Sequence, residues 1–199
     1  MKQTKSIVNM IRIGVGVITL IVAGVFYIPT LFDSGSESVA KNIQKAVPVL
    51  SSFSVGDVRL DSIREYYANN VGYIQDDLDN KEQYAAQGYT EEDFAAWEAE
   101  MEISRILAEK IPDTVETKAD SVSGAFVGTD DGQEVRGIFV YEFKDGAPIT
   151  KELAEKANTS SYELYYVKGN YVITIEYQFL QGNNLSQELI FEAANNAIK

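Results

Sequence analysis

The longest apolar stretch of the chain lies close to its N-terminus. Residues 13–32 contain no charged side chain, and they are bounded by Arg12 on one side and Asp33 on the other. A helix of this length rises about 1.5 Å per residue, so it is about 30 Å long and matches the hydrocarbon core of a bilayer. The pattern predicts a transmembrane signal-anchor helix over 13–32 that contacts the lipid bilayer.

The charges beside this span indicate its orientation. Lys2, Lys5 and Arg12 precede it, whereas only Lys41 and Lys45 follow within about 15 residues, and an excess of positive charge marks the cytoplasmic side. We therefore expect a single-pass protein with a short cytoplasmic tail and an extracytoplasmic domain. A cleaved signal peptide would have a shorter apolar core, and the reverse orientation would place the domain in the cytosol.

Small side chains line one face of the predicted span. Gly16, Thr19 and Ala23 follow one another at spacings of three and four residues, so they share one side of a helix. Such a side permits the close approach of another transmembrane helix. These three residues are the candidates for helix association within the membrane.

The next segments alternate between polar connectors and helical patterns. A polar run after Asp33 leads into a predicted helix over 38–46, and Pro48 ends it soon afterwards. Apolar residues then recur every three or four positions, which predicts a helix over 58–80. They are Ile63, Tyr67, Val71, Ile74 and Leu78.

A second long helix is predicted to begin near Thr90. Asp93 follows Thr90 by three residues, as in a capping box, and acidic side chains in the first turn suit the positive end of the helix dipole. This helix extends to about Lys110, shortly before Pro112. Two long helices joined by about ten residues pack most simply as an antiparallel hairpin.

Beyond Pro112 the apolar period shortens towards two, which is typical of strands. Strands are predicted over 121–128, 134–143, 162–168 and 171–180, with helices over 151–156 and near the C-terminus. The order is ββαββα, and an antiparallel sheet with helices on one face would satisfy both patterns. The fold class is therefore α+β. The predicted segments are 1–12 (tail), 13–32 (anchor), 33–56 (connector and short helix), 57–112 (hairpin) and 113–199 (α+β domain).

The amino-acid composition excludes many kinds of catalytic and metal-binding chemistry. The chain has no His and no Cys, so it lacks the residue types of histidine-based triads, cysteine nucleophiles, and imidazole or thiolate metal sites. Neither a Walker loop nor a dinucleotide fingerprint is present. We therefore expect no catalytic residues and no cofactor. The net charge of −13 disfavours nucleic acid as a partner.

Carboxylates and tyrosines remain as candidate functional groups. Asp76, Asp77, Asp79 and Glu82 cluster near the end of the first long helix, where they form either a cation site or a solvated helix end. Because Lys81 interrupts the spacing of an EF-hand loop, we expect no metal there. Four tyrosines around the hairpin are candidates for partner binding, with core packing as the alternative. They are Tyr66, Tyr73, Tyr84 and Tyr89.

These observations predict a non-enzymatic, membrane-anchored protein whose outer domain binds a protein partner. A tail of about a dozen residues before the span is too short for a signalling domain, so we expect an accessory subunit of a cell-envelope assembly. The first alternative is an envelope module that binds a small molecule or a glycan. The second is a carboxylate-dependent hydrolase, which would need two acidic side chains facing each other across a cleft.

Overall fold

The computed structural model describes residues 35–112, 122–130 and 135–199, with the side chain of Asp130 excepted. The chain divides into two units, Met1–Asp33 and Ser34–Lys199, and all described residues belong to the second unit. The predicted anchor over 13–32, with Gly16, Thr19 and Ala23, lies outside the described residues. Within the described ranges, no helix combines the length and apolarity needed to cross a membrane.

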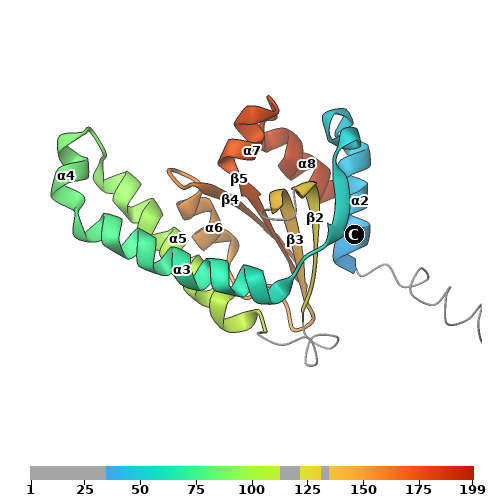
Figure 1. The fold of residues 1–199 in the computed structure, drawn as a ribbon, viewed down its shortest axis with the longest axis horizontal. Coiled ribbons are helices and arrows are strands. Elements are labelled where there is room, and N and C mark those ends of the chain that lie inside the picture. The colour runs from blue at the N-terminus through green and yellow to red at the C-terminus, as the bar shows by residue number, and fades with distance from the viewer. Residues whose placement is uncertain (1–34, 113–121, 131–134) are drawn as a thin grey trace, which may run out of the picture. The chain divides into compact units, whose positions relative to one another are not determined.

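Among the described residues, five antiparallel strands form one sheet in the spatial order β1-β2-β3-β5-β4 (Figure 1). The strands are β1 (Ser54–Asp57), β2 (Val122–Asp130), β3 (Val135–Phe143), β4 (Glu163–Lys168) and β5 (Tyr171–Glu176). The sequence had indicated four strands, and β1 adds a fifth by pairing Val55 with Val127 at one edge. The α+β class with an antiparallel sheet is confirmed.

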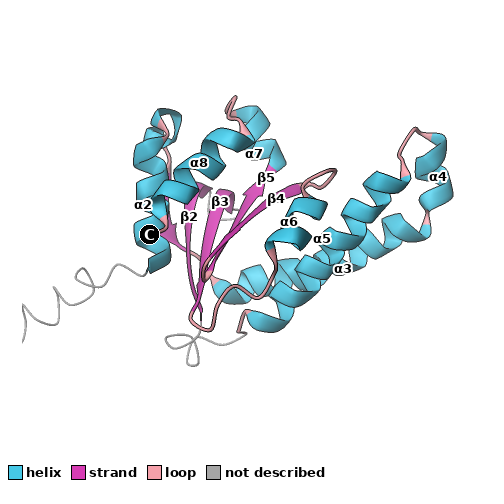
Figure 2. Cartoon of the chain, turned by 180° about the vertical axis from the view of Figure 1, so that it is seen from behind, coloured by secondary structure: helices cyan, strands magenta, loops and turns pink. Residues whose placement is uncertain are grey.

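Helices cover both faces of this sheet, so the expectation of helices on one face is wrong (Figure 2). One face is covered by α2 (Gly35–Ala46), the 3-10 helix Pro48–Ser52, α7 (Tyr177–Gly182) and α8 (Gln187–Ala197). The other face is covered by α3 (Leu60–Asp79), α5 (Glu91–Lys110) and α6 (Lys151–Ala157), while α4 (Lys81–Ala86) joins α3 to α5.

Successive side chains of the central strands point to opposite faces of the sheet, and each face contributes to one hydrophobic core. Val140 and Ile173 point towards α2 and α8, whereas their neighbours Tyr141 and Val172 point towards α3 and α5. Successive strand residues face opposite sides of a sheet. Thr174 follows Val172 by two residues and is likewise fully buried on the α3 side, where the Tyr67 hydroxyl donates to it.

The last predicted strand, 171–180, ends earlier than its alternation suggested. β5 stops at Glu176, and the chain turns into α7. Phe179 and Leu180 are both buried in the core beneath α2 and α8, and the Phe179 ring lies 5.1 Å from that of Phe53. Consecutive residues of a strand cannot enter the same core. The helical turn therefore allows both side chains to be buried together.

The two long helices pack side by side, and their ends have different surroundings. Near the sheet, α5 contributes Ile103 and Leu107 to the core beneath α3. Towards α4, a separate small core contains Ile74, Leu78, Phe94 and Trp97. Figure 1 shows this second part extending beyond the sheet, with α4 at its tip. The hairpin thus packs on the sheet with one half and projects with the other.

The predicted start of α5 is confirmed in detail. The Asp93 N–H donates to Thr90 Oγ1 at 3.3 Å, and the Thr90 N–H donates to Asp93 Oδ2 at 2.7 Å. These reciprocal bonds form a capping box, which satisfies backbone donors that a helix start otherwise leaves unpaired.

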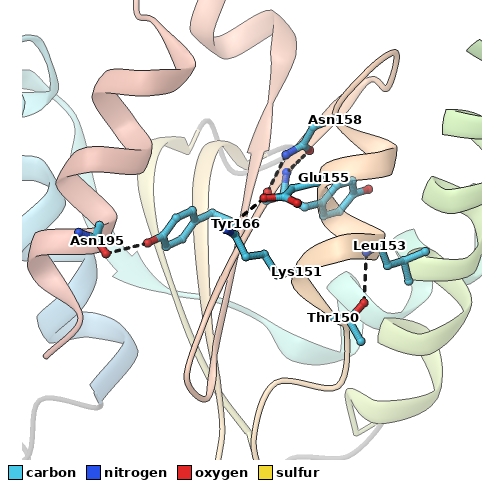
Figure 3. A network of polar contacts seen from close by, with 8 residues as sticks. Thr150, Lys151, Leu153, Glu155, Asn158, Tyr166 and Asn195 are labelled. Carbon is cyan, nitrogen blue, oxygen red and sulfur yellow. Dashed lines mark hydrogen bonds and ion pairs between the residues drawn. The ribbon is translucent and has the colours of Figure 1, made fainter. Parts of the chain in front are cut away.

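The short helix α6 fixes the edge strand β4, as Figure 3 shows for Asn158. Asn158 Nδ2 donates to the Tyr165 carbonyl at 2.9 Å, and the Tyr165 N–H donates to Asn158 Oδ1 at 2.8 Å. Thr150 caps α6 by accepting from the Leu153 N–H. On the other face, Tyr166 Oη donates to Asn195 in α8. Because β4 is an edge strand, Asn158 satisfies backbone groups that lack a neighbouring strand.

Candidate functional site

A cavity of about 430 Å³ lies between α3 and the sheet. This volume falls in the range of small-molecule sites, about 300–1,000 Å³. All five strands contribute to its lining, together with the start of α3 and the two residues before it. The lining residues are Asp57, Val58, Arg59, Ser62, Ile63, Tyr66, Tyr67, Phe126, Val135, Phe139, Tyr141, Glu163 and Glu176.

Glu163 is the central polar group of this cavity. It is only 4% exposed, yet each carboxylate oxygen has a tyrosine donor. Tyr66 Oη donates to Oε1 at 3.1 Å, and Tyr165 Oη donates to Oε2 at 3.0 Å. Burial raises the pKa of Glu163 to about 7, against the lowering effect of these hydrogen bonds. The group therefore changes charge near neutral pH.

A second buried acid, Glu100, lies on α5 near Glu163. Glu100 is 1% exposed, and its Oε2 accepts from the Tyr162 N–H at 3.4 Å. Burial, and then the negative charge of Glu163, raise the pKa of Glu100 to about 8, while hydrogen bonds from Tyr162 and Asn70 lower it. Two neighbouring carboxyl groups are thus held by α5 and β4 in an apolar interior.

Two further tyrosines point into the same interior from α3 and β3. Tyr67 Oη donates to Thr174 Oγ1 at 3.2 Å. Tyr141 is fully buried and lines the cavity, and its hydroxyl has no hydrogen-bond partner among the described residues. Burial, and then the charge of Glu163, raise the pKa of Tyr141, whereas the neighbouring side chains of Tyr67 and Thr174 lower it. The Tyr141 hydroxyl therefore keeps its proton within a cluster of buried polar groups.

The charged groups of the cavity are mainly acidic. Among the described lining residues, Asp57, Glu163 and Glu176 are acidic and Arg59 is basic. Asp57 pairs with Ala125, so its side chain points to the opposite face of the sheet. Arg59 is largely exposed and forms an ion pair with Asp61 at 3.1 Å. Glu163 and Glu176 occupy directly paired positions on β4 and β5. The cavity therefore combines several aromatic residues with the paired acidic residues Glu163 and Glu176.

The structure separates the four tyrosines that the sequence proposed for partner binding. Tyr66 lies at the cavity, where its hydroxyl reaches Glu163 although 45% of the residue is exposed. Tyr73 lies further along α3 and is 70% exposed. Tyr84 packs edge-on against Trp97 and Tyr89 packs against it at a tilt, each with its ring centroid 5.2 Å from that of Trp97. These last two rings cover the small core of the projecting half.

The acidic cluster near the end of α3 lies apart from this cavity. Tyr84 Oη donates to Asp77 at 2.5 Å, and Gln75 donates to Asp79 at 2.9 Å. In the part of the chain that the structure describes, no group of three or more acidic side chains is arranged to hold a metal ion.

Sequence reasoning did not select Glu163, Glu100 or Tyr141. Glu163 precedes Leu164 and Tyr165 in a strand, so the period of two places it on the same face as Tyr165. Glu100 lies one residue before Met101 and three after Trp97, on the apolar side of α5. An acidic residue at a core-facing position was the available signal in both cases.

Comparison with known proteins returned no relationship: no protein-family model, no curated protein sequence and no solved structure matches this chain.

Proposed function

We propose that this chain is a non-enzymatic, membrane-anchored protein whose outer domain binds a small molecule in the cavity beneath α3. The observation that carries the proposal is a cavity of about 430 Å³ whose lining brings several aromatic residues together with the buried carboxyl of Glu163. Concave sites with mainly apolar walls and a few fixed polar groups are typical of small-molecule binding.

The arrangement of the acids supports binding rather than hydrolysis. Glu163 and Glu176 are neighbours on one wall, from adjacent strands. Glycosidases place their two carboxyl groups on either side of the scissile bond. In addition, both oxygens of Glu163 already accept hydrogen bonds from tyrosines. The site is thus built to hold a ligand against a fixed polar group.

A thermal-shift screen of the full-length protein in mild detergent tests this proposal. A ligand that binds only the folded state raises the unfolding midpoint. Ser62→Phe places a ring at the cavity lining, and Asn69→Phe places the same ring two turns further along α3, at an exposed position outside the lining. We expect stabilising compounds to lose their effect in Ser62→Phe and keep it in Asn69→Phe. Equal responses of both variants would contradict the proposal.

The membrane location rests on residues 13–32 and needs its own test. We propose that these residues span the membrane, with residues 1–12 in the cytoplasm. In spheroplasts carrying a C-terminally tagged chain, we expect external protease to remove the tag. Protection of the tag would reverse the orientation and place the domain in the cytosol.

A protein partner is the second candidate function, and the projecting half of the hairpin favours it. That half has its own small core around Trp97, and it displays Tyr73 with 70% of its surface exposed. Exposed tyrosines are common in protein interfaces. A photo-crosslinking residue at Tyr73 should yield a discrete adduct in native membranes, whereas the same residue at the exposed Asp145 should not. No adduct at Tyr73 would count against this candidate.

A further inference from the structure

The buried acids Glu100 and Glu163 meet where α5 contacts the start of β4. We propose that this pair is a pH-dependent switch: residues 161–163 stay packed against α5 while the pair holds a proton, and separate from it when both carboxyl groups are ionised. The inference concerns a conformational change of the domain, so it does not depend on a ligand in the cavity.

The two carboxyl groups are neighbours that come from separate elements. Glu100 Oε2 of α5 accepts from the N–H of Tyr162, the residue directly before Glu163. The two acids are 1% and 4% exposed, so water is largely excluded from both. Burial raises the pKa of each, to about 8 for Glu100 and about 7 for Glu163, and the charge of Glu163 adds to the effect on Glu100. The second ionisation of the pair therefore opposes the packing of α5 on β4.

Neutral donors, and no cation among the described residues, act on this pair. The groups that shift the pKa of either acid include no lysine or arginine in the described part of the chain. The charged side chains of the neighbouring helix α6 are exposed, and Lys151 pairs there with Glu155 at 3.2 Å. The groups that face the two acids are Tyr66, Tyr67 and Asn70 of α3, Tyr141 of β3, Tyr162 and Tyr165 at β4, and Glu176 of β5.

Repulsion within the pair can be relieved at low cost because the start of β4 is the end of an edge strand. Glu163 is the first residue of β4 and pairs with Glu176, the last residue of β5. Tyr162, just before it, is 63% exposed. Strand ends with few buried contacts open locally at a small fraction of the free energy of unfolding. Further along β4, the two hydrogen bonds between Tyr165 and Asn158 hold the strand, so the opening is confined to residues 161–163.

Amide hydrogen exchange of the full-length protein in mild detergent, at pH 6 and pH 8, tests this switch. The reporters are the N–H groups of Tyr162 and Tyr177, which donate to Glu100 and to the Tyr162 carbonyl in the closed form. After division by the intrinsic rate at each pH, we expect both to exchange about tenfold faster or more at pH 8. The reason is that the open form is ionised over this range while the closed form still binds protons. At pH 8 both should also exchange about tenfold faster or more than amides in the centre of β3.

Three variants assign the effect to the pair. Glu100→Gln keeps an acceptor for the Tyr162 N–H and removes one ionisation, so it should reduce the change between pH 6 and pH 8. The double variant Glu100→Gln/Glu163→Gln should abolish the change. Glu98→Gln alters an exposed acid of the same helix, which pairs with Lys81, and should leave the change as in the wild type.

Three results would each overturn the switch. The first is equal corrected exchange at pH 6 and pH 8 for Tyr162 and Tyr177 in the wild type. The second is a pH dependence that persists in the double variant, because other groups would then control the opening. The third is equal exchange at pH 8 for these amides and for the centre of β3, which would indicate unfolding of the whole domain.

Discussion

Replacing Glu100 by glutamine tests how the buried acids affect stability. Folding buries this carboxyl to 1% exposure and raises its pKa from 4.5 to about 8, mainly through burial and then through the charge of Glu163. The folded state therefore binds more protons than the unfolded state between these two pH values. Because the pKa is raised, the stability of the protein falls as the pH rises through this window.

The size of the effect follows from the two pKa values. One pH unit of pKa difference corresponds to about 1.4 kcal/mol, so the full penalty for the ionised group reaches about 5 kcal/mol. Between pH 5 and pH 8, where part of the titration takes place, linkage gives a loss of about 3 kcal/mol from Glu100 alone. Glu163, with a raised pKa of about 7, adds to the loss in the same direction.

Glu100→Gln should remove the contribution of this one group. The amide oxygen can still accept from the Tyr162 N–H, so the variant should resemble the wild type at pH 5. At pH 8 we expect it to be more stable than the wild type by about 3 kcal/mol. Urea unfolding at pH 5, 6.5 and 8 measures this difference. Trp97 is the single tryptophan and is buried, so its fluorescence reports unfolding.

A neighbouring acid on the same helix provides the control. Glu98 is exposed and pairs with Lys81 at 3.1 Å. Glu98→Gln should lose only the small contribution of a surface ion pair, about 1 kcal/mol or less, and keep the wild-type dependence on pH. If Glu100→Gln shows the same loss of stability between pH 5 and pH 8 as the wild type, the reasoning about burial is refuted.

Three further predictions concern the sheet, the hairpin and the anchor. Gly128→Ala should destabilise the protein by several kcal/mol, because the new Cβ would lie 1.9 Å from the Arg136 carbonyl oxygen. Gly72→Ala, at a helix position with no atom near the new Cβ, should instead stabilise the protein by about 0.5–1 kcal/mol. Chemical denaturation measures both changes. Thr90→Ala should cost about 1 kcal/mol by breaking the capping box, seen as faster amide exchange at the start of α5. Deletion of residues 1–32 should move the protein from the membrane fraction to the soluble fraction, and retention would argue against the anchor.

Local patterns in the sequence were sufficient for most of the helices and strands. The spacing of Thr90 and Asp93 predicted the start of α5, and the capping box is present. The predicted strand over 134–143 corresponds to β3, and the predicted strand over 162–168 corresponds to β4. Gly169 lies in the turn between β4 and β5 with a positive φ of 62°. These features depend on residues a few positions apart, so a short window of sequence contains their physical cause.

The core between the sheet and α3 depends on contacts between residues that are far apart in the sequence. Thr174 is a polar strand residue, yet it is fully buried, and Tyr67, 107 residues away in the chain, donates a hydrogen bond to it. A polar residue is compatible with burial when a distant side chain supplies its hydrogen bond. The placement of helices on both faces therefore followed from pairing between distant residues.

The sequence by itself determined that the chain has an apolar run suited to a membrane span, an acidic domain of α+β type, and no histidine or cysteine chemistry. Only the tertiary structure decided that Glu163, Tyr66 and Tyr141, from β4, α3 and β3, line one cavity. A residue's type and spacing set its local conformation, because these act over a few residues. Burial, pKa and hydrogen-bond partners are set by whichever distant elements pack against it, and these exist only once the chain has folded.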